Sequence, residues 1–159
     1  MGKDKLKRFN EIATFANVFE IEPVHKGFWG ANYFKNSHPI VLELGCGTGK
    51  NTEWLLNKAE RIIGLDFSQE MLNKAKEKIS DKRVTFKKVD LTKDWKTENN
   101  FADLITSSLT LEHIKNLDHI FSQANQKLKK NGLFFISELH PFKQYSGSKA
   151  QYETESGTK

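Results

Sequence analysis

The sequence has a single cysteine, Cys46, among its 159 residues. One cysteine excludes an internal disulfide and is typical of a reducing compartment, so we expect a cytoplasmic protein. Apolar runs are short, and none approaches the roughly 20 residues that a membrane-spanning helix needs, which predicts no membrane partner. The charged start, MGKDKLKRFNEI, lacks the apolar stretch of a secretory signal. Cysteine and histidine nowhere cluster at metal-ligand spacing, so we predict no metal site.

The chain also lacks an acidic excess. Lys and Arg number 25 against 20 Asp and Glu, which gives a net charge of +5 and a pI of about 9.2. This balance permits an anionic partner such as RNA but does not require one. Lysines in residues 74–88 and 127–130 fall on expected helix faces and connections, which favours solvated surface over a nucleic-acid patch. The length suits one domain with its own core.

Three glycines at alternate positions stand out in what the sequence does contain. Residues 39–50, PIVLELGCGTGK, run from an apolar stretch through Glu43 to Gly45, Gly47 and Gly49. An apolar run followed by a glycine-rich turn and helix-compatible residues predicts a buried parallel strand that leads into a helix. Glycine lets a ligand approach the backbone, and N–H groups at the helix start can face that ligand. We therefore predict a nucleotide-type cofactor site.

Apolar strand-like segments alternate with segments of helical spacing along most of the chain. We predict strands at residues 40–44, 61–65, 84–89, 102–107 and 133–137, and helices at 51–58, 69–79 and 117–130. The last helix is expected to end at Asn131-Gly132, a left-handed C-cap signature. This alternation indicates an α/β fold, a Rossmann-like, doubly wound parallel sheet of about five strands. Ligands of such sheets lie beyond the carboxyl ends of the strands.

The flanks differ from this alternating part. Residues 3–20 have apolar side chains at helical spacing and predict an amphipathic helix, with a basic arm directed at phosphate as the alternative. An aromatic, glycine-punctuated stretch at 25–34 either covers the site or forms a small core of its own. We therefore divide the chain into residues 1–38 packed on the domain, a cofactor-binding domain at 39–142, and a polar tail at 143–159.

Polar residues follow the expected strands. Asp66 ends the second strand nineteen residues after Gly47, about the spacing at which an acid reaches a ribose hydroxyl pair. Ser68 is a good N-cap for the next helix. Asp90 ends the third strand, and residues 107–113, SSLTLEH, follow the fourth. The Gly-x-Gly-x-Gly spacing departs from the G-x-G-x-x-G of nicotinamide-dinucleotide sites, but with these groups it is strong evidence for a nucleotide-type cofactor.

Five segments resemble, in order, the successive motifs of class I S-adenosylmethionine-dependent methyltransferases: LELGCGTGK, IGLDFSQEML, VDLT, DLITSSLTLEHI and LKKNGLFFISELHPF. The resemblance covers residues 39–142 and implies S-adenosylmethionine as the cofactor. It implies that Glu43 and the glycine turn hold the methionine portion, that Asp66 binds the ribose hydroxyls, and that other residues flank the adenine or the transferred methyl. The implied cofactor residues are Glu43, Gly45, Cys46, Gly47, Thr48, Gly49 (methionine portion); Asp66 (ribose); Phe67, Met71, Asp90, Leu91 (adenine); Ser107 and Leu109 (methyl end).

The resemblance is not uniform along the chain. FNEIATFANVFE and then KGFWGANYFKNSHPIVLELGCG are similar to bacterial tRNA (guanine-N7) methyltransferases, whereas residues 107–113 resemble small-molecule methyltransferases, so we interpret the chain as a mosaic. The family usually adds two strands after the fifth, one of them antiparallel, and we expect these to be absent. Such a chain is a fragment, a minimal domain or one partner of a complex. An exposed edge of the fifth strand would then allow pairing in a homo-oligomer.

Three functions stay open on the sequence. The favoured one is methyl transfer to a small-molecule or other non-nucleic-acid acceptor, and the alternatives are a tRNA or RNA methyltransferase and a non-catalytic cofactor-binding module. Because the sulfonium methyl is electrophilic, catalysis can rest on proximity and orientation. Where the acceptor must lose a proton, the candidate bases are Glu112, His113 and His140. Each of these also has an ordinary interpretation as a helix-start or turn residue.

Overall fold

A five-stranded parallel sheet forms the centre of the computed structural model, which describes residues 38–138, 153–154 and 157–158. The strands are β1 (Ile40–Leu44), β2 (Arg61–Asp66), β3 (Val84–Lys88), β4 (Ala102–Ser108) and β5 (Leu128–Ser137), in the order β3-β2-β1-β4-β5. Every neighbouring pair in this sheet is parallel. The α/β, Rossmann-like prediction is therefore confirmed. The expected N-terminal helix, the aromatic stretch at 25–34 and His140 lie outside the described residues.

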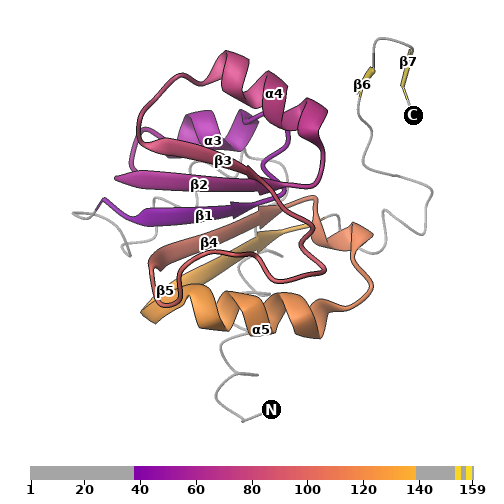
Figure 1. Cartoon of the computed structure of the whole chain (residues 1–159). Helices are drawn as coiled ribbons and strands as arrows, with labels where there is room; N and C mark the ends of the chain where they lie inside the picture. The colour runs from indigo at the N-terminus through magenta and orange to yellow at the C-terminus, as the bar shows by residue number, and fades with distance from the viewer. Residues whose placement is uncertain (1–37, 139–152, 155–156, 159) are drawn as a thin grey trace.

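Helices cover both faces of the sheet (Figure 1). The helices α3 (Lys50–Leu55) and α4 (Gln69–Lys78) lie on one side, and α5 (Leu117–Lys127) lies on the other. A short 3₁₀ helix, η2 (Leu111–His113), precedes α5. The central strand β1 is buried on both faces, with Val41, Leu42 and Leu44 fully inaccessible to solvent. This is the pattern of a strand between two helical layers.

The segment between β3 and β4 contains no helix and packs against α5. Trp95 is fully buried there; its backbone N–H donates to Gln123 Oε1 at 3.2 Å and its indole Nε1 donates to the Leu91 carbonyl at 3.1 Å. Lys127, 4% exposed, donates from Nζ to the Thr97 carbonyl and to Asn99 Oδ1, at 2.9 Å each. Trp95 and Lys127 therefore hold this polar segment against α5.

The largest departure from the predicted boundaries is at the end of α5, and α3 also ends at Leu55, three residues before the predicted end. The helix ends at Lys127, and β5 begins at Leu128 rather than at Leu133. Asn131 does have a left-handed backbone, with φ of 67°, but it lies inside β5 and does not cap the helix. The β4–β5 register shifts between Ala102 and Leu104, so extra β5 residues must be accommodated there. Strand pairing at Ala102, which no local pattern encodes, therefore decides this boundary.

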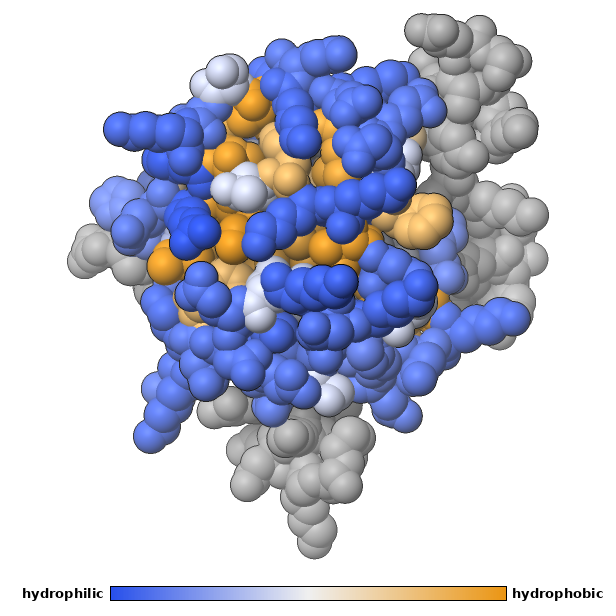
Figure 2. All heavy atoms as spheres, viewed as in Figure 1, coloured by the Kyte–Doolittle hydropathy of each residue, from blue (hydrophilic) through white to orange (hydrophobic). Residues whose placement is uncertain are grey.

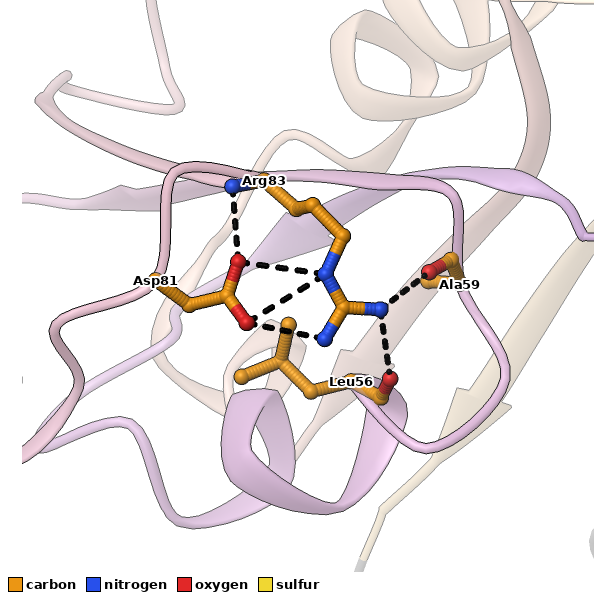
Figure 3. A network of polar contacts seen from close by, with 4 residues as sticks. All are labelled: Leu56, Ala59, Asp81 and Arg83. Atoms are coloured by element: carbon orange, nitrogen blue, oxygen red, sulfur yellow. Dashed lines mark hydrogen bonds and ion pairs between the residues drawn. The ribbon is translucent and has the colours of Figure 1, made fainter.

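Arg83 connects two loops at the amino ends of the strands, opposite the edge where the strands end (Figure 3). Arg83, just before β3, donates from Nη1 to the carbonyls of Leu56 and Ala59 at the end of α3, at 3.1 and 3.2 Å. Its Nη2 lies 2.8 Å from Asp81 Oδ2, and its backbone N–H donates to Asp81 Oδ1 at 2.8 Å. The side-chain hydrogen bonds from Arg83 lower the pKa of Asp81 to about 2. This network joins the starts of β2 and β3.

The surface of the described part is mostly polar. Figure 2 shows hydrophobic residues between polar ones over α4 and the strands beside it, whereas the surface over α5 is almost entirely hydrophilic. Among the described helices, none has the length and apolar character that crossing a membrane requires. The short strands β6 (Glu153–Thr154) and β7 (Gly157–Thr158) pair with each other antiparallel, apart from the main sheet.

Candidate cofactor site

The sequence-predicted site residues meet at the C-terminal edge of the sheet. Because the order is β3-β2-β1-β4, the row of strand ends carries Asp90, Asp66, the glycine turn and the loop of residues 109–113 side by side. Adjacent strands lie about 4.8 Å apart, so this row spans roughly 14 Å. A ligand that uses acceptors on β2 and β3 and extends over the turn must therefore direct its remaining end toward β4.

The glycines of the turn have different functions in the structure. A Cβ added to Gly45 would lie 2.1 Å from Thr110 Oγ1, so Gly45 gives room to the β4 loop and not to a ligand. A Cβ added to Gly49 would meet Ile79 Cδ1 at 2.8 Å, so Gly49 allows the close packing of α4. Gly47, with φ of 53°, would direct a Cβ into open space, with no atom within 4 Å. Of the three, only Gly47 matches the expectation of close ligand approach.

Asp66 connects β2 to this turn. Its Oδ2 accepts the Gly47 N–H at 2.8 Å, and its Oδ1 accepts the Ser68 N–H at 2.8 Å. A carboxylate has about four lone-pair sites, so each oxygen keeps one acceptor direction beyond these bonds. Ser68 caps α4 by accepting from the Met71 N–H at 3.3 Å, as predicted. The half-buried Asp66 therefore shapes the turn and can still receive two hydroxyl donors.

Two of the predicted cofactor residues, Glu43 and Cys46, are buried beneath the turn. Glu43, 3% exposed, accepts a hydrogen bond of 2.5 Å from Thr52 Oγ1. Burial raises the pKa of Glu43 to about 7, against the opposing effect of the Thr52 bond, and the Asp66 charge adds to the rise. Burial also raises the pKa of the Cys46 thiol, with the two carboxylates adding to it. Cys46, 5% exposed, packs beneath the turn, and its raised pKa favours the thiol over the thiolate.

The adenine-flanking candidates are partly exposed. Phe67 is 70% exposed directly after β2, and Met71 is half-buried on the first turn of α4. Asp90 Oδ1 accepts from the Thr92 hydroxyl at 2.6 Å and the Thr92 N–H at 3.0 Å, and these bonds lower the pKa of Asp90. Leu91, in contrast, is 7% exposed and has its side chain in the core.

The loop after β4 contains the remaining predicted residues. Ser107 is 1% exposed, whereas Leu109 is 45% exposed and has a left-handed backbone with φ of 52°. Of the candidate bases, His113 has a 70% exposed side chain whose Nε2 lies 3.6 Å from Glu112 Oε1. His140, the third candidate, lies outside the described residues. Thr48 is exposed on the turn, and no group of three or more potential metal ligands occurs within the described ranges.

Glu138, directly after β5, contacts the loop after β4, and the sequence patterns did not single it out. Its Oε1 accepts from the Leu111 N–H at 3.0 Å, from the Thr110 N–H at 3.2 Å and from Ser107 Oγ at 3.5 Å. Burial raises the pKa of Glu138, and the backbone donors of the loop oppose that rise. Its partners lie 27 to 31 residues away in the sequence, so no local pattern predicts these bonds. The only sequence signal here is ISELHPF, which is part of the fifth methyltransferase-like segment.

Comparison with known proteins identifies the family of this chain. A family model described as a methyltransferase domain matches residues 42–136, which is more than half of the chain. The chain belongs to the S-adenosylmethionine-dependent methyltransferases. The matched range begins in β1 and ends in β5, so it includes the carboxyl ends of β1, β2, β3 and β4.

Known methyltransferases are similar to different extents of the chain. A tRNA (guanine-N(7)-)-methyltransferase of Christiangramia forsetii is 46% identical over 77 residues, 41% of this chain and 34% of that protein. A ubiquinone biosynthesis O-methyltransferase of Pelagibacter ubique is 28% identical over 88% of this chain and 66% of its own length. A crystal structure of an S-adenosylmethionine-dependent methyltransferase from Mesorhizobium loti superposes with a TM-score of 0.64 at 28% identity, covering 76% of this chain and 55% of the other. The chain thus spans about a third of the tRNA methyltransferase that it matches.

The methyltransferase family's cofactor, S-adenosylmethionine, fits the residues present. Its ribose hydroxyls require acceptors, and Asp66 has two unfilled acceptor directions. Open space lies over Gly47, where a side chain would otherwise stand. Phe67 presents a largely exposed aromatic ring next to that acid, which suits a planar base.

Proposed function

We propose that this protein transfers the methyl group of S-adenosylmethionine to a small-molecule acceptor. The proposal is carried by the loop at the methyl end of the row. Residues 107–113, SSLTLEH, contain no lysine or arginine, and Leu109 is exposed there. A tRNA acceptor needs basic groups that neutralise phosphates near the reacting base. An apolar side chain beside an acid and a histidine instead suits a compact organic molecule.

The side chains of this protein then have distinct tasks. The bound cofactor supplies an electrophilic methyl group on its sulfonium centre. Asp66 and Gly47 hold the ribose part, and Glu43 supports the turn from below through its hydrogen bond to Thr52. Leu109 keeps water from the methyl end, which favours direct attack by the acceptor. Where the acceptor must lose a proton, His113 beside Glu112 is the base proposed here.

The similarity pattern supports the small-molecule acceptor. Similarity to an enzyme of ubiquinone biosynthesis extends over 88% of the chain, whereas similarity to the tRNA enzyme extends over 41%. A tRNA acceptor is the second candidate, because the identity to that tRNA methyltransferase reaches 46% and the net charge is +5. Cofactor binding without any turnover would characterise the third candidate, a non-catalytic module.

The test is a methyl-transfer assay with the purified chain. Formation of S-adenosylhomocysteine is measured with panels of phenols, carboxylic acids and amines, and in parallel with unmodified tRNA. We expect turnover with at least one small-molecule class and none with tRNA. Turnover with tRNA, together with binding that weakens steeply as salt rises, would establish the RNA alternative. Tight cofactor binding with no product from either panel would establish the non-catalytic module.

We also propose that β5 pairs with a second copy of the chain. Within the described residues β5 is one of the two outer strands of the sheet, with β3 at the other edge, and an outer strand can pair with a strand of another chain. Light scattering in solution should then give twice the mass of 18.3 kDa, and a monomer would contradict pairing. A cytoplasmic location stays a prediction that rests on the single cysteine.

A further inference from the structure

The carboxylate of Glu138 bonds to the loop after β4 through one oxygen atom. Oε1 accepts from the N–H groups of Thr110 and Leu111, the first residues of the 3₁₀ turn, and from Ser107 Oγ. Oε2 is buried and has no hydrogen-bond partner among the residues that the structure describes. An acid buried in this way is costly to ionise unless donors face it. The loop supplies those donors, so acid and loop stabilise each other's position.

The same loop is also attached to the glycine turn. The Thr110 hydroxyl lies within hydrogen-bond distance of two carbonyl acceptors. Its Oγ1 is 3.4 Å from the Leu44 carbonyl and 3.1 Å from the Ser108 carbonyl. The Thr110 side chain occupies the space over Gly45. Glu138 therefore connects the end of β5, through Thr110, with the turn after β1.

Leu109 has an energetically unfavourable backbone conformation, so its position depends on the hydrogen bonds of the loop. A left-handed conformation costs a non-glycine residue about 1 kcal/mol or more, and Leu109 has φ of 52°. Its N–H donates to the Ser137 carbonyl at 2.9 Å, and the next two N–H groups donate to Glu138. Without the Glu138 acceptor, two backbone donors lose their partner and the loop can relax away from the row of strand ends.

We propose that Glu138 is a positioning residue for the amino-acid end of the cofactor, acting through the loop of residues 109–111. The inference rests on the methyl-donor site proposed above but not on the identity of the acceptor. Asp66 and Asp90 lie on the nucleoside side of the row, whereas the direct hydrogen bonds of Glu138 are all to the β4 side. Loss of its acceptor should therefore affect the amino-acid part of the ligand and not the nucleoside part.

Two ligands separate these parts. S-adenosylhomocysteine carries both, whereas 5′-methylthioadenosine lacks the amino-acid portion, and calorimetry gives the affinity of each for the full chain. We expect Glu138→Leu to weaken S-adenosylhomocysteine roughly ten- to hundredfold, because two backbone donors lose their acceptor. Binding of 5′-methylthioadenosine should change by less than about threefold. Glu138→Gln keeps an acceptor of the same reach and should bind both ligands nearly as the natural chain does.

Two further variants keep the inference testable if Glu138→Leu does not fold. Glu138→Asp keeps the charge but withdraws the carboxylate by one methylene, and it should show the same selective loss. In a Leu109→Gly background, where the left-handed backbone is relaxed, the effect of Glu138→Asp should shrink. Equal weakening of both ligands, or no weakening of either, would overturn the positioning role. Because these are binding measurements, absence of methyl transfer would count against the proposed function and leave this inference standing.

Discussion

Substituting alanine at two neighbouring glycines should separate stability from cofactor binding. Gly45 and Gly47 both have left-handed backbones, with φ of 67° and 53°. They differ in what an added methyl group meets. At Gly45 it overlaps Thr110, with Oγ1 at 2.1 Å and Cγ2 at 2.7 Å, whereas at Gly47 nothing lies within 4 Å. Each variant is thus a control for the other.

The expected magnitudes follow from these contacts. Both variants incur the left-handed penalty of about 1 kcal/mol. Gly45→Ala must also displace Thr110, which breaks its hydrogen bonds and overpacks the turn, for about 2–4 kcal/mol more. At about 2–4 °C per kcal/mol for a domain of this size, Gly47→Ala should melt about 3 °C lower and Gly45→Ala roughly 10 °C lower.

Thermal melting and calorimetry of the two variants provide the test. Gly47→Ala should bind S-adenosylhomocysteine roughly tenfold or more weakly, because its methyl group stands where the ligand approaches the backbone. Two results would refute the reasoning: equal melting temperatures for both variants, or an affinity of Gly47→Ala equal to that of the natural chain. The first would mean that Thr110 does not occupy the space over Gly45. The second would remove Gly47 from the site.

Two other perturbations test the core under the turn and the distant Arg83 network. Burial raises the pKa of Glu43 to about 7. The contribution of its proton uptake to the free energy of unfolding is therefore fully present below about pH 4.5 and is lost as pH rises through 7. Glutamine does not titrate, so the unfolding free energy of Glu43→Gln should rise relative to that of the natural chain by up to about 3 kcal/mol between pH 4.5 and 8. Urea denaturation at several pH values measures this difference, and a difference that does not change with pH would contradict the prediction. Arg83→Ala removes two hydrogen bonds to carbonyls at the end of α3 and should lower the melting temperature by roughly a few degrees. Its S-adenosylhomocysteine affinity should not change, and a weaker affinity would mean that this network influences the site.

Local patterns were sufficient for much of the sheet and for several site residues. β1 has the predicted bounds because an apolar run ends there in a glycine turn. Ser68 caps α4 because a serine before an apolar-periodic segment is a short-range signal. Asp66 lies beside Gly47 because parallel strands that are neighbours end at the same edge. Each of these predictions depended on residues close in sequence or on adjacent strands.

Contacts between distant segments could not be predicted. The Asn131-Gly132 pair has the sequence of a helix C-cap, but pairing of Leu128 with Ala102 draws this segment into β5. Gly45 was expected to make room for a ligand, and its neighbour is Thr110, which lies 65 positions later. Glu138 was overlooked because its bonds to Thr110 and Leu111 form only once β4 and β5 are paired. A single sequence contains no local signal for such contacts.

The proposed cofactor site depends above all on Asp66 binding the ribose of the methyl donor. Calorimetric titration of Asp66→Ala with S-adenosylmethionine tests it, with Asp81→Ala as the matched control. Both acids accept the N–H of the residue two positions on at 2.8 Å, but Asp81 lies at the opposite edge of the sheet. We predict that Asp66→Ala weakens binding roughly hundredfold or more, through the loss of two charge-assisted hydrogen bonds, while Asp81→Ala retains the natural affinity. An unchanged affinity in Asp66→Ala, or equal losses in both variants, would contradict the account.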